Sequence, residues 1–122
     1  MMKRQSEHIL QKQIVNLLRK SGIVTVGCDV MSGLMFAGKD LAKRYTFIAH
    51  HKAIGATIGQ PDLILLLRDG ETLLVELKNG KQGKQSLEQK LFQERCNKLN
   101  HNYVVWRDYK DALDFIDGYR KI

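Results

Sequence analysis

Cysteine and proline are scarce in this chain, and acidic side chains are fewer than basic ones. The two cysteines, Cys28 and Cys96, lie far apart, and neither has a second cysteine close by. His101 follows Cys96, but one such pair is too little for a zinc site. We therefore expect both cysteines to be buried, reduced side chains rather than metal ligands or a disulfide.

Long hydrophobic runs are also missing. The longest uninterrupted apolar stretch, residues 63–67, is far too short to cross a bilayer. The first residues, Met-Met-Lys-Arg-Gln-Ser-Glu-His, lack the apolar core of a secretory signal. The sequence therefore predicts a soluble cytoplasmic protein.

Basic charge is what the chain has in surplus. Its 20 Lys and Arg residues stand against 13 Asp and Glu, for a formal net charge of +7. Such a surplus favours a polyanionic partner, nucleic acid first and an anionic membrane surface second. On charge alone, a merely basic soluble protein is an equal alternative. A hydrophobic content of 43% in 122 residues predicts one globular domain spanning the whole chain, residues 1–122.

Hydrophobic periodicity predicts an α/β fold, with a mixed sheet flanked by helices in the order α-β-β-β-α-β-α. Ser6 caps a first helix to about Lys20, Ser86 a second to about Leu99, and Asp108 a third. Residues 23–27, 62–68, 72–78 and 103–106 read as strands, and residues 45–49 as a further strand that this order leaves aside. The predicted inward side chains of the last two helices are Leu91, Phe92, Arg95, Cys96, Leu99, Leu113, Phe115 and Ile116.

Glu76 and Lys78 are the first candidates for catalysis, because strand residues two apart share a face. A Glu-x-Lys pair taken alone is most often a surface ion pair. Here the strand is otherwise largely apolar, and a second acid, Asp62, begins the neighbouring strand.

Pairing register decides whether Asp62 joins them. A two-residue turn at Asp69-Gly70 places Asp62 opposite Leu77, on the wrong face. A three-residue loop that includes Arg68 places it opposite Glu76, and this loop ends in glycine, as a bulged hairpin prefers. Turn propensity slightly favours the shorter turn, but the chemistry requires an odd loop, and we predict the odd loop.

Two converging carboxylates repel each other unless a cation lies between them, and oxygen ligands suit Mg²⁺ or Mn²⁺. Such an ion lowers the pKa of a bound water and neutralises charge on a phosphate under attack. Lys78 on the same face can orient that water or stabilise the transition state. Glu7 is a further metal candidate, although an acid in a first helical turn is also favoured by the helix dipole. Gln89 forms a capping box with Ser86, so it is structural, catalytic or both.

Several basic residues are candidates for phosphate contacts, although a run of charge is usually a solvated loop. His50 and His51 are expected at the surface or at phosphates rather than as ligands. The last helix carries an acidic stripe, Asp111, Asp114 and Asp117, which should point away from nucleic acid. The candidate DNA-binding residues are Lys39, Lys43, Arg44, Lys52, Lys81 and Lys84.

These motifs resemble a known family. Gly59-Gln60-Pro61-Asp62, followed after 13 residues by Glu76-Leu77-Lys78, resembles the PD-(D/E)xK nuclease signature. With Ser6-Glu7, Gln11 and Gln13 in the first helix and Ser86-x-x-Gln89 in a later one, the chain resembles the virus-type replication-repair nuclease (VRR-NUC) domain. The resemblance runs from Ser6 to about Ile116 and is loose in the middle, where it depends on Ser32-Gly33 and Gly59.

The resemblance implies a restriction-endonuclease-like core and Mg²⁺- or Mn²⁺-dependent hydrolysis of DNA. Glu7, Asp62, Glu76 and the carbonyl of Leu77 would bind metal, Lys78 would act on the attacking water, and Gln89 would support the site. A stand-alone domain resembles the small viral and prophage members, which look like Holliday-junction resolvases. A C2 dimer, with residues 31–53 as dimer surface and DNA track, would supply two matched cuts. The alternatives are a sequence-specific or non-specific nuclease, or a non-catalytic DNA-binding module.

Overall fold

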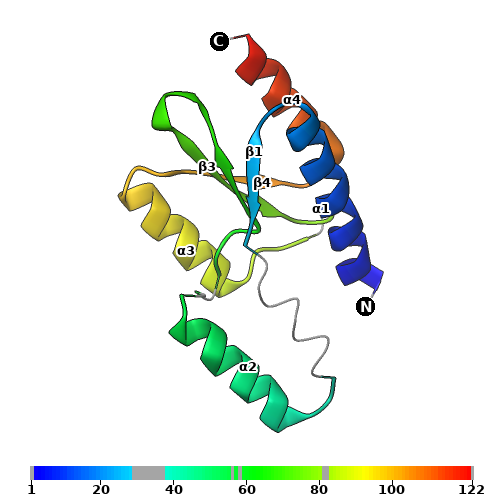
Figure 1. Ribbon diagram of the computed structural model, residues 1–122, viewed down its shortest axis with the longest axis vertical. Helices are drawn as coiled ribbons and strands as arrows, with labels where there is room; N and C mark the ends of the chain where they lie inside the picture. The colour runs from blue at the N-terminus through cyan, green and yellow to red at the C-terminus, as the bar shows by residue number, and fades with distance from the viewer. Residues whose placement is uncertain (1, 29–37, 56, 58, 81–82, 122) are drawn as a thin grey trace.

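The chain folds into a four-stranded sheet with helices on both faces (Figure 1). The computed structural model describes residues 2–28, 38–55, 57, 59–80 and 83–121. Its elements are α1 (Met2–Lys20), β1 (Val24–Gly27), α2 (Leu41–Ala53), β2 (Leu63–Leu66), the short 3₁₀ turn η2 (Arg68–Gly70), β3 (Thr72–Leu77), α3 (Leu87–Lys98), β4 (Asn102–Trp106) and α4 (Tyr109–Arg120). The strands lie in the order β1-β2-β3-β4, and β4 runs parallel to β3 whereas the other neighbours are antiparallel.

The main core lies between one face of the sheet and the helices α1 and α4. Alternate residues of β2 and β3 point to this face, as the two-residue period of a strand requires. Its buried members include Ile14 and Leu18 of α1, Leu63 and Leu65 of β2, Leu73, Val75 and Leu77 of β3, Trp106 of β4, and Ala112 and Ile116 of α4. The opposite face of β3 and β4 is covered by α3, which buries Cys96.

The predicted hairpin register is confirmed. Leu63 pairs with Val75 and Leu66 with Thr72, and the chain turns through three residues, Arg68–Gly70. Asp69 and Gly70 have positive φ angles of 59° and 73°, which glycine and aspartate tolerate better than most residues. Continuing this register by one residue brings Asp62 level with Glu76.

The observed order, α-β-α-β-β-α-β-α, contains the predicted elements and one additional helix, because residues 45–49 are not a strand. They lie inside α2, whose N-cap is Asp40, and the side chain of Asp40 accepts a hydrogen bond from the Lys43 N–H at 3.1 Å. The run Tyr45 to Ala49 is rich in residues that favour strands, and the cap three residues before Lys43 outweighs that preference. None of the residues of α2 is buried, and the helix stands away from the sheet at the lower edge of Figure 1.

Smaller corrections concern helix ends and faces. α1 begins at Met2 rather than after Ser6, and β2 ends at Leu66 rather than at Arg68. Capping by Ser86 and by Asp108 is confirmed, since each side chain accepts a hydrogen bond from a backbone N–H of its helix. Four of the side chains predicted to point inward are exposed instead: Leu91, Arg95, Leu99 and Leu113.

Within the residues that the structure describes, no helix is both long enough and apolar enough to span a membrane. Both cysteines are free thiols; Cys96 is buried, as predicted, and Cys28 is half-buried.

Candidate active site

Glu76 is the most unusual residue of the sheet, because it is a fully buried acid with 0% of its surface exposed. It lies on β3 among apolar neighbours, on the face opposite the main core. Its Oε1 accepts a hydrogen bond from the Tyr103 hydroxyl at 2.9 Å. Its Oε2 is equally buried and has no hydrogen-bond partner among the described residues. A buried carboxylate oxygen without a partner is costly, so this atom marks a place where a cation would be stabilised.

Asp62 is held at the same end of the sheet by main-chain contacts. Its Oδ2 accepts a hydrogen bond from the Leu77 N–H at 2.7 Å, and its own N–H donates to the Val75 carbonyl at 3.0 Å. The N–H and C=O of one strand residue leave the same edge of the strand, so the Leu77 carbonyl also lies on the Asp62 side. The structure thus brings Asp62, Glu76 and Leu77 together, as the sequence predicted.

The electrostatics agree with this proximity. Burial raises the pKa of Tyr103 well above its ordinary value, and the charges of Glu76 and Asp62 raise it further. Burial also raises the pKa of the Cys28 thiol, and the charge of Asp62 adds to that shift. Tyr103 therefore stays a protonated donor beside the two acids, and negative charge accumulates at this end of the sheet.

Lys78 follows Glu76 by two residues and is half-buried just beyond the end of β3. Its N–H donates to the Trp106 carbonyl at 3.0 Å, which continues the pairing with β4. The backbone of Gly83 lies close to it: a Cβ built on Gly83 would stand 3.1 Å from Cβ of Lys78. The guanidinium of Arg107 donates to the carbonyls of Gly80 and Gly83, the two described residues on either side of residues 81–82.

The segment before Asp62 is fixed from both sides. Gln60 donates its side-chain amide to the Cys28 carbonyl and accepts from the Thr57 N–H at 2.8 Å. Gly59 has φ +84°, and a Cβ there would stand 2.3 Å from the Glu88 carbonyl oxygen. Only glycine permits this close approach to the first turn of α3.

Gln89 has a structural role. Its side-chain oxygen accepts from the Ser86 N–H at 2.8 Å, and its own N–H donates to Ser86 Oγ at 3.2 Å. These two bonds make up the predicted capping box. Glu7 is half-buried on α1, and no group of three or more His, Cys, Asp or Glu that could hold a metal ion occurs in the described part of the chain. Glu7 therefore stays a prediction.

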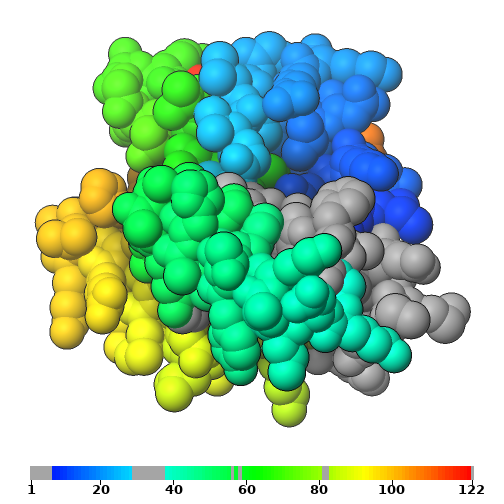
Figure 2. All heavy atoms as spheres, turned by 60° about the horizontal axis from the view of Figure 1, so that its bottom comes forward, coloured from blue at the N-terminus to red at the C-terminus, as the bar shows by residue number. Residues whose placement is uncertain are grey.

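Four of the six candidate DNA-binding residues, Lys39, Lys43, Arg44 and Lys52, lie on or just before α2, which is in the foreground of Figure 2. Lys39, Lys43 and Lys52 are exposed, as is Lys84 in the loop before α3. Arg44 is half-buried and donates to the Gly38 carbonyl at 3.1 Å. Of the remaining residues named from the sequence, Lys81, Ser32 and Gly33 lie outside the described residues.

Tyr103, which donates a hydrogen bond to Glu76, was not predicted from the sequence. The strand containing Tyr103 was predicted, but its parallel register against β3, with Leu74 opposite Tyr103, was not. That register puts Tyr103 on the face of Glu76. A tyrosine next to the centre of a largely apolar strand was the available signal, because a buried phenol usually needs a hydrogen-bond partner.

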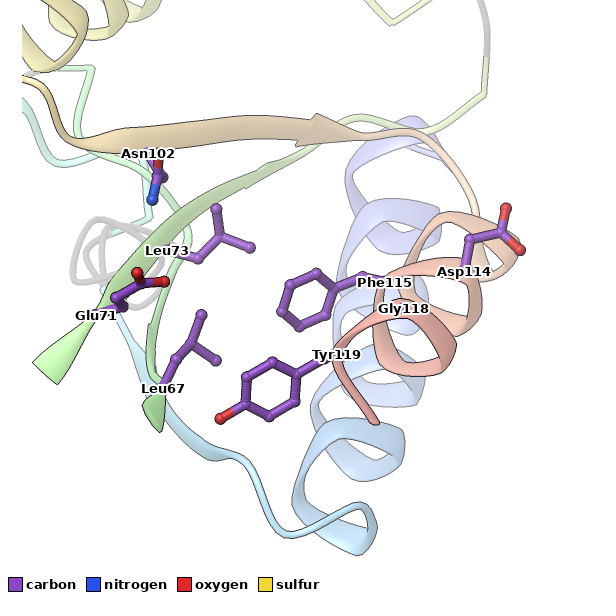
Figure 3. Close-up of a pocket in the computed structure, with 8 residues that line it drawn as sticks. All are labelled: Leu67, Glu71, Leu73, Asn102, Asp114, Phe115, Gly118 and Tyr119. Carbon is purple, nitrogen blue, oxygen red and sulfur yellow. The ribbon is translucent and has the colours of Figure 1, made fainter. Parts of the chain in front are cut away.

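An open hollow elsewhere in the molecule takes no part in this site. Figure 3 shows it between α4 and the starts of β3 and β4, lined by Leu67, Leu73, Phe115 and Tyr119 and flanked by Glu71. It lies at the end of β3 away from Glu76 and Lys78. Its apolar floor and acidic border do not suit a phosphate.

A comparison of folds gives one clear likeness. No protein-family model matches the chain, and no curated protein sequence does. A solved structure described as a VRR_NUC domain superimposes with a TM-score of 0.63 at 21% identity, covering 93% of this chain and 97% of the other. The fold is that of a VRR-NUC domain. The predicted fold class, and the likeness to VRR-NUC domains at the level of the fold, are therefore confirmed.

Proposed function

We propose that this VRR-NUC-like domain is a divalent-metal-dependent DNA endonuclease that acts on branched DNA. The observation that carries the proposal is the buried carboxylate of Glu76, whose Oε2 lacks a partner, next to Asp62 at the end of the sheet. Acids near phosphates repel them unless a metal lies between. A DNA-binding module without catalysis would have no use for this pair.

The donor set fits a hard divalent cation. Mg²⁺ is commonly bound by one or two carboxylates and keeps several of its waters, so two acids and a main-chain carbonyl suffice. Asp62, Glu76 and the carbonyl of Leu77 would hold the ion, with Glu7 as a further candidate. Such an ion would supply a water of lowered pKa and neutralise charge on the phosphate.

Lys78 is the group that we propose to act on the reacting atoms. It lies on the same face as Glu76 and just beyond the strand end, where its ammonium can orient the attacking water or offset charge on the phosphate. The Arg107 contacts to Gly80 and Gly83 fix two described residues near Lys78 and therefore help to keep Lys78 at the site.

The proposed DNA track begins at this loop and continues to α2. Lys84 and the exposed lysines of the α2 region offer ammonium groups for the phosphate backbone. The acidic stripe lies on α4, which packs against α1 on the other face of the sheet. Binding should therefore weaken steeply with salt, as it does for any protein that neutralises several phosphates.

Two surfaces with exposed apolar side chains support a homodimer. On the outer half of the sheet, Val24 of β1 and Leu66 of β2 are 57% and 48% exposed. Around α2, Leu41, Tyr45 and Ile54 are 66%, 69% and 68% exposed. A second copy could cover both surfaces, and a C2 pair would present two sites to a nearly two-fold symmetric junction. Light scattering tests this: a monomer at working concentrations argues against the dimer and leaves the nuclease proposal intact.

A substrate panel tests the proposed function. Labelled single-stranded, duplex, flap, splayed and four-way DNA, together with an RNA duplex, are incubated with Mg²⁺, Mn²⁺ or EDTA. We expect metal-dependent cleavage that is lost in Asp62→Asn, with paired symmetric cuts in the four-way substrate. Equal cleavage of plain duplex would favour a non-specific nuclease. Cleavage that survives in EDTA or in Asp62→Asn would refute the site.

A further inference from the structure

Tyr103 has no role in the signature that resembles a nuclease, yet within the described part of the chain it makes the one side-chain hydrogen bond to the Glu76 carboxylate, at 2.9 Å. Both partners are buried: Glu76 is 0% exposed and Tyr103 is 9% exposed. Water therefore does not compete for this bond, and the carboxylate has little freedom to find another donor among the described residues around it.

A phenol has one proton to donate, so it can satisfy only one of the two carboxylate oxygens. Tyr103 donates to Oε1, and Oε2 is left buried without a partner. The bond also fixes the rotation of the carboxylate, since turning the group would break it. Before any ligand binds, Oε1 of Glu76 thus accepts the Tyr103 hydrogen bond, whereas Oε2 is available to a cation.

The ring of Tyr103 is itself held in place. Phe92 of α3 packs against it with ring centroids 6.4 Å apart and planes tilted by 48°. Tyr103 pairs with Leu74 in the parallel register of β4 and β3, which sets the phenol on the face of Glu76. A chain of contacts therefore runs from α3 through Phe92 and Tyr103 to Glu76.

We infer that Tyr103 is a positioning residue that reserves Oε2 of Glu76 for a divalent cation. This inference rests on the proposed metal-dependent function. Tyr103 does not touch substrate. It acts through Glu76, as the outer partners of metal ligands do in other sites, where their removal commonly weakens metal binding by roughly 10-fold to 100-fold.

Isothermal titration of metal-stripped protein with Mn²⁺ tests the inference. We expect Tyr103→Phe, which keeps the ring against Phe92, to weaken Mn²⁺ binding by roughly 10-fold to 100-fold. Tyr109→Phe is the matched control, because it removes a hydroxyl from a tyrosine that is 40% exposed at the start of α4. This control should bind Mn²⁺ as the unmodified protein does. If Tyr103→Phe binds Mn²⁺ as tightly as Tyr109→Phe does, or more tightly, the inference is overturned.

Two further variants keep the outcomes distinct. If Tyr103→Phe does not fold, Phe92→Leu decides: it loosens the ring contact and keeps the hydroxyl, so it should weaken Mn²⁺ binding to a smaller extent. Unchanged binding in Phe92→Leu would then overturn the inference. Asp62→Asn reports on the proposed function itself. If the unmodified protein binds no Mn²⁺, or if Asp62→Asn binds it equally well, the metal site fails regardless of Tyr103.

Discussion

Replacing Glu76 by glutamine should stabilise the metal-free protein while removing its activity. In the unmodified chain, Oε2 of Glu76 is buried, and none of the residues that the structure describes forms a hydrogen bond with it. A buried polar group in this state costs about 1–3 kcal/mol, and more if it is charged. Glutamine keeps a carbonyl oxygen that can accept from Tyr103 and replaces the acid by a neutral amide, which costs less to bury. We therefore expect Glu76→Gln to raise the free energy of unfolding in EDTA by about 1 kcal/mol.

A bound divalent metal should make the unmodified protein more stable than Glu76→Gln. A ligand that binds the folded state at 100 times its Kd adds about 2.7 kcal/mol of stability. The unmodified protein should gain this amount with Mn²⁺, and Glu76→Gln should gain nothing. Urea unfolding followed by circular dichroism, with and without Mn²⁺, measures both effects. Glu94→Gln is the matched control, since Glu94 is exposed on α3 and its replacement should change stability by no more than about 0.5 kcal/mol.

Two results would contradict this reasoning. A Glu76→Gln variant that loses more than about 1 kcal/mol in EDTA would show that the carboxylate is well satisfied without metal. Equal stabilisation of the variant and the unmodified protein by Mn²⁺ would show that the ion binds somewhere else.

Other predictions concern the surroundings of the site. Gly59→Ala should lower the free energy of unfolding in urea by more than Gly22→Ala does. Gly22 has a similar φ of +82°, which alone costs an alanine about 1–2 kcal/mol, but no atom of the described residues lies close to its added Cβ. Equal losses in the two variants would refute the close approach of Gly59 to α3. Arg107→Ala should lower cleavage by up to roughly 100-fold through misplacement of the loop, with Mn²⁺ affinity unchanged; unaltered cleavage would contradict that role. Because burial and the charge of Asp62 raise the pKa of the Cys28 thiol, its alkylation should become fast only at a higher pH than that of a free cysteine. Mass spectrometry of the alkylated protein measures this rate, and a Cys28 thiol that reacts quickly near neutral pH would contradict the prediction.

Local sequence patterns were sufficient for most of the fold. The alternation of residues in β3, the cap at Ser86 and the cap at Asp108 are all short-range signals, and all three appear as predicted. The hairpin register is a different case. Turn propensity slightly favoured the wrong loop, and the need to bring Asp62 level with Glu76 gave the right one.

The errors have physical causes as well. In α2, strand-forming residues are next to an Asp40 cap, and no burial pattern arbitrates between the two because the helix buries nothing. In α3 and α4, the 3.6-residue period suggests a wider apolar face than the sheet covers. Leu91, Leu99 and Leu113 are therefore exposed, since each helix covers the sheet along a narrow stripe only.

The charged and the neutral residues of the candidate site differ in what the sequence reveals about them. Asp62, Glu76 and Lys78 are revealed by charge in an otherwise apolar context. Tyr103 belongs to another strand, and its contact with Glu76 depends on the register of two strands joined through α3. A register across such a crossover has no local signal comparable to a hairpin loop, so this hydrogen bond is visible only in three dimensions.

The most direct test of the nuclease account is the cleavage rate of labelled four-way DNA in Mg²⁺, measured under single-turnover conditions for Lys78→Ala and Lys121→Ala. Both variants remove one lysine ammonium from the same basic protein, but Lys121 is exposed at the C-terminal end of α4. That end lies beside the Arg68 turn, at the opposite end of β3 from Glu76. The account predicts that Lys78→Ala loses cleavage while still binding DNA, and that Lys121→Ala cleaves at the rate of the unmodified protein. Full cleavage by Lys78→Ala, or equal losses in the two variants, would contradict it.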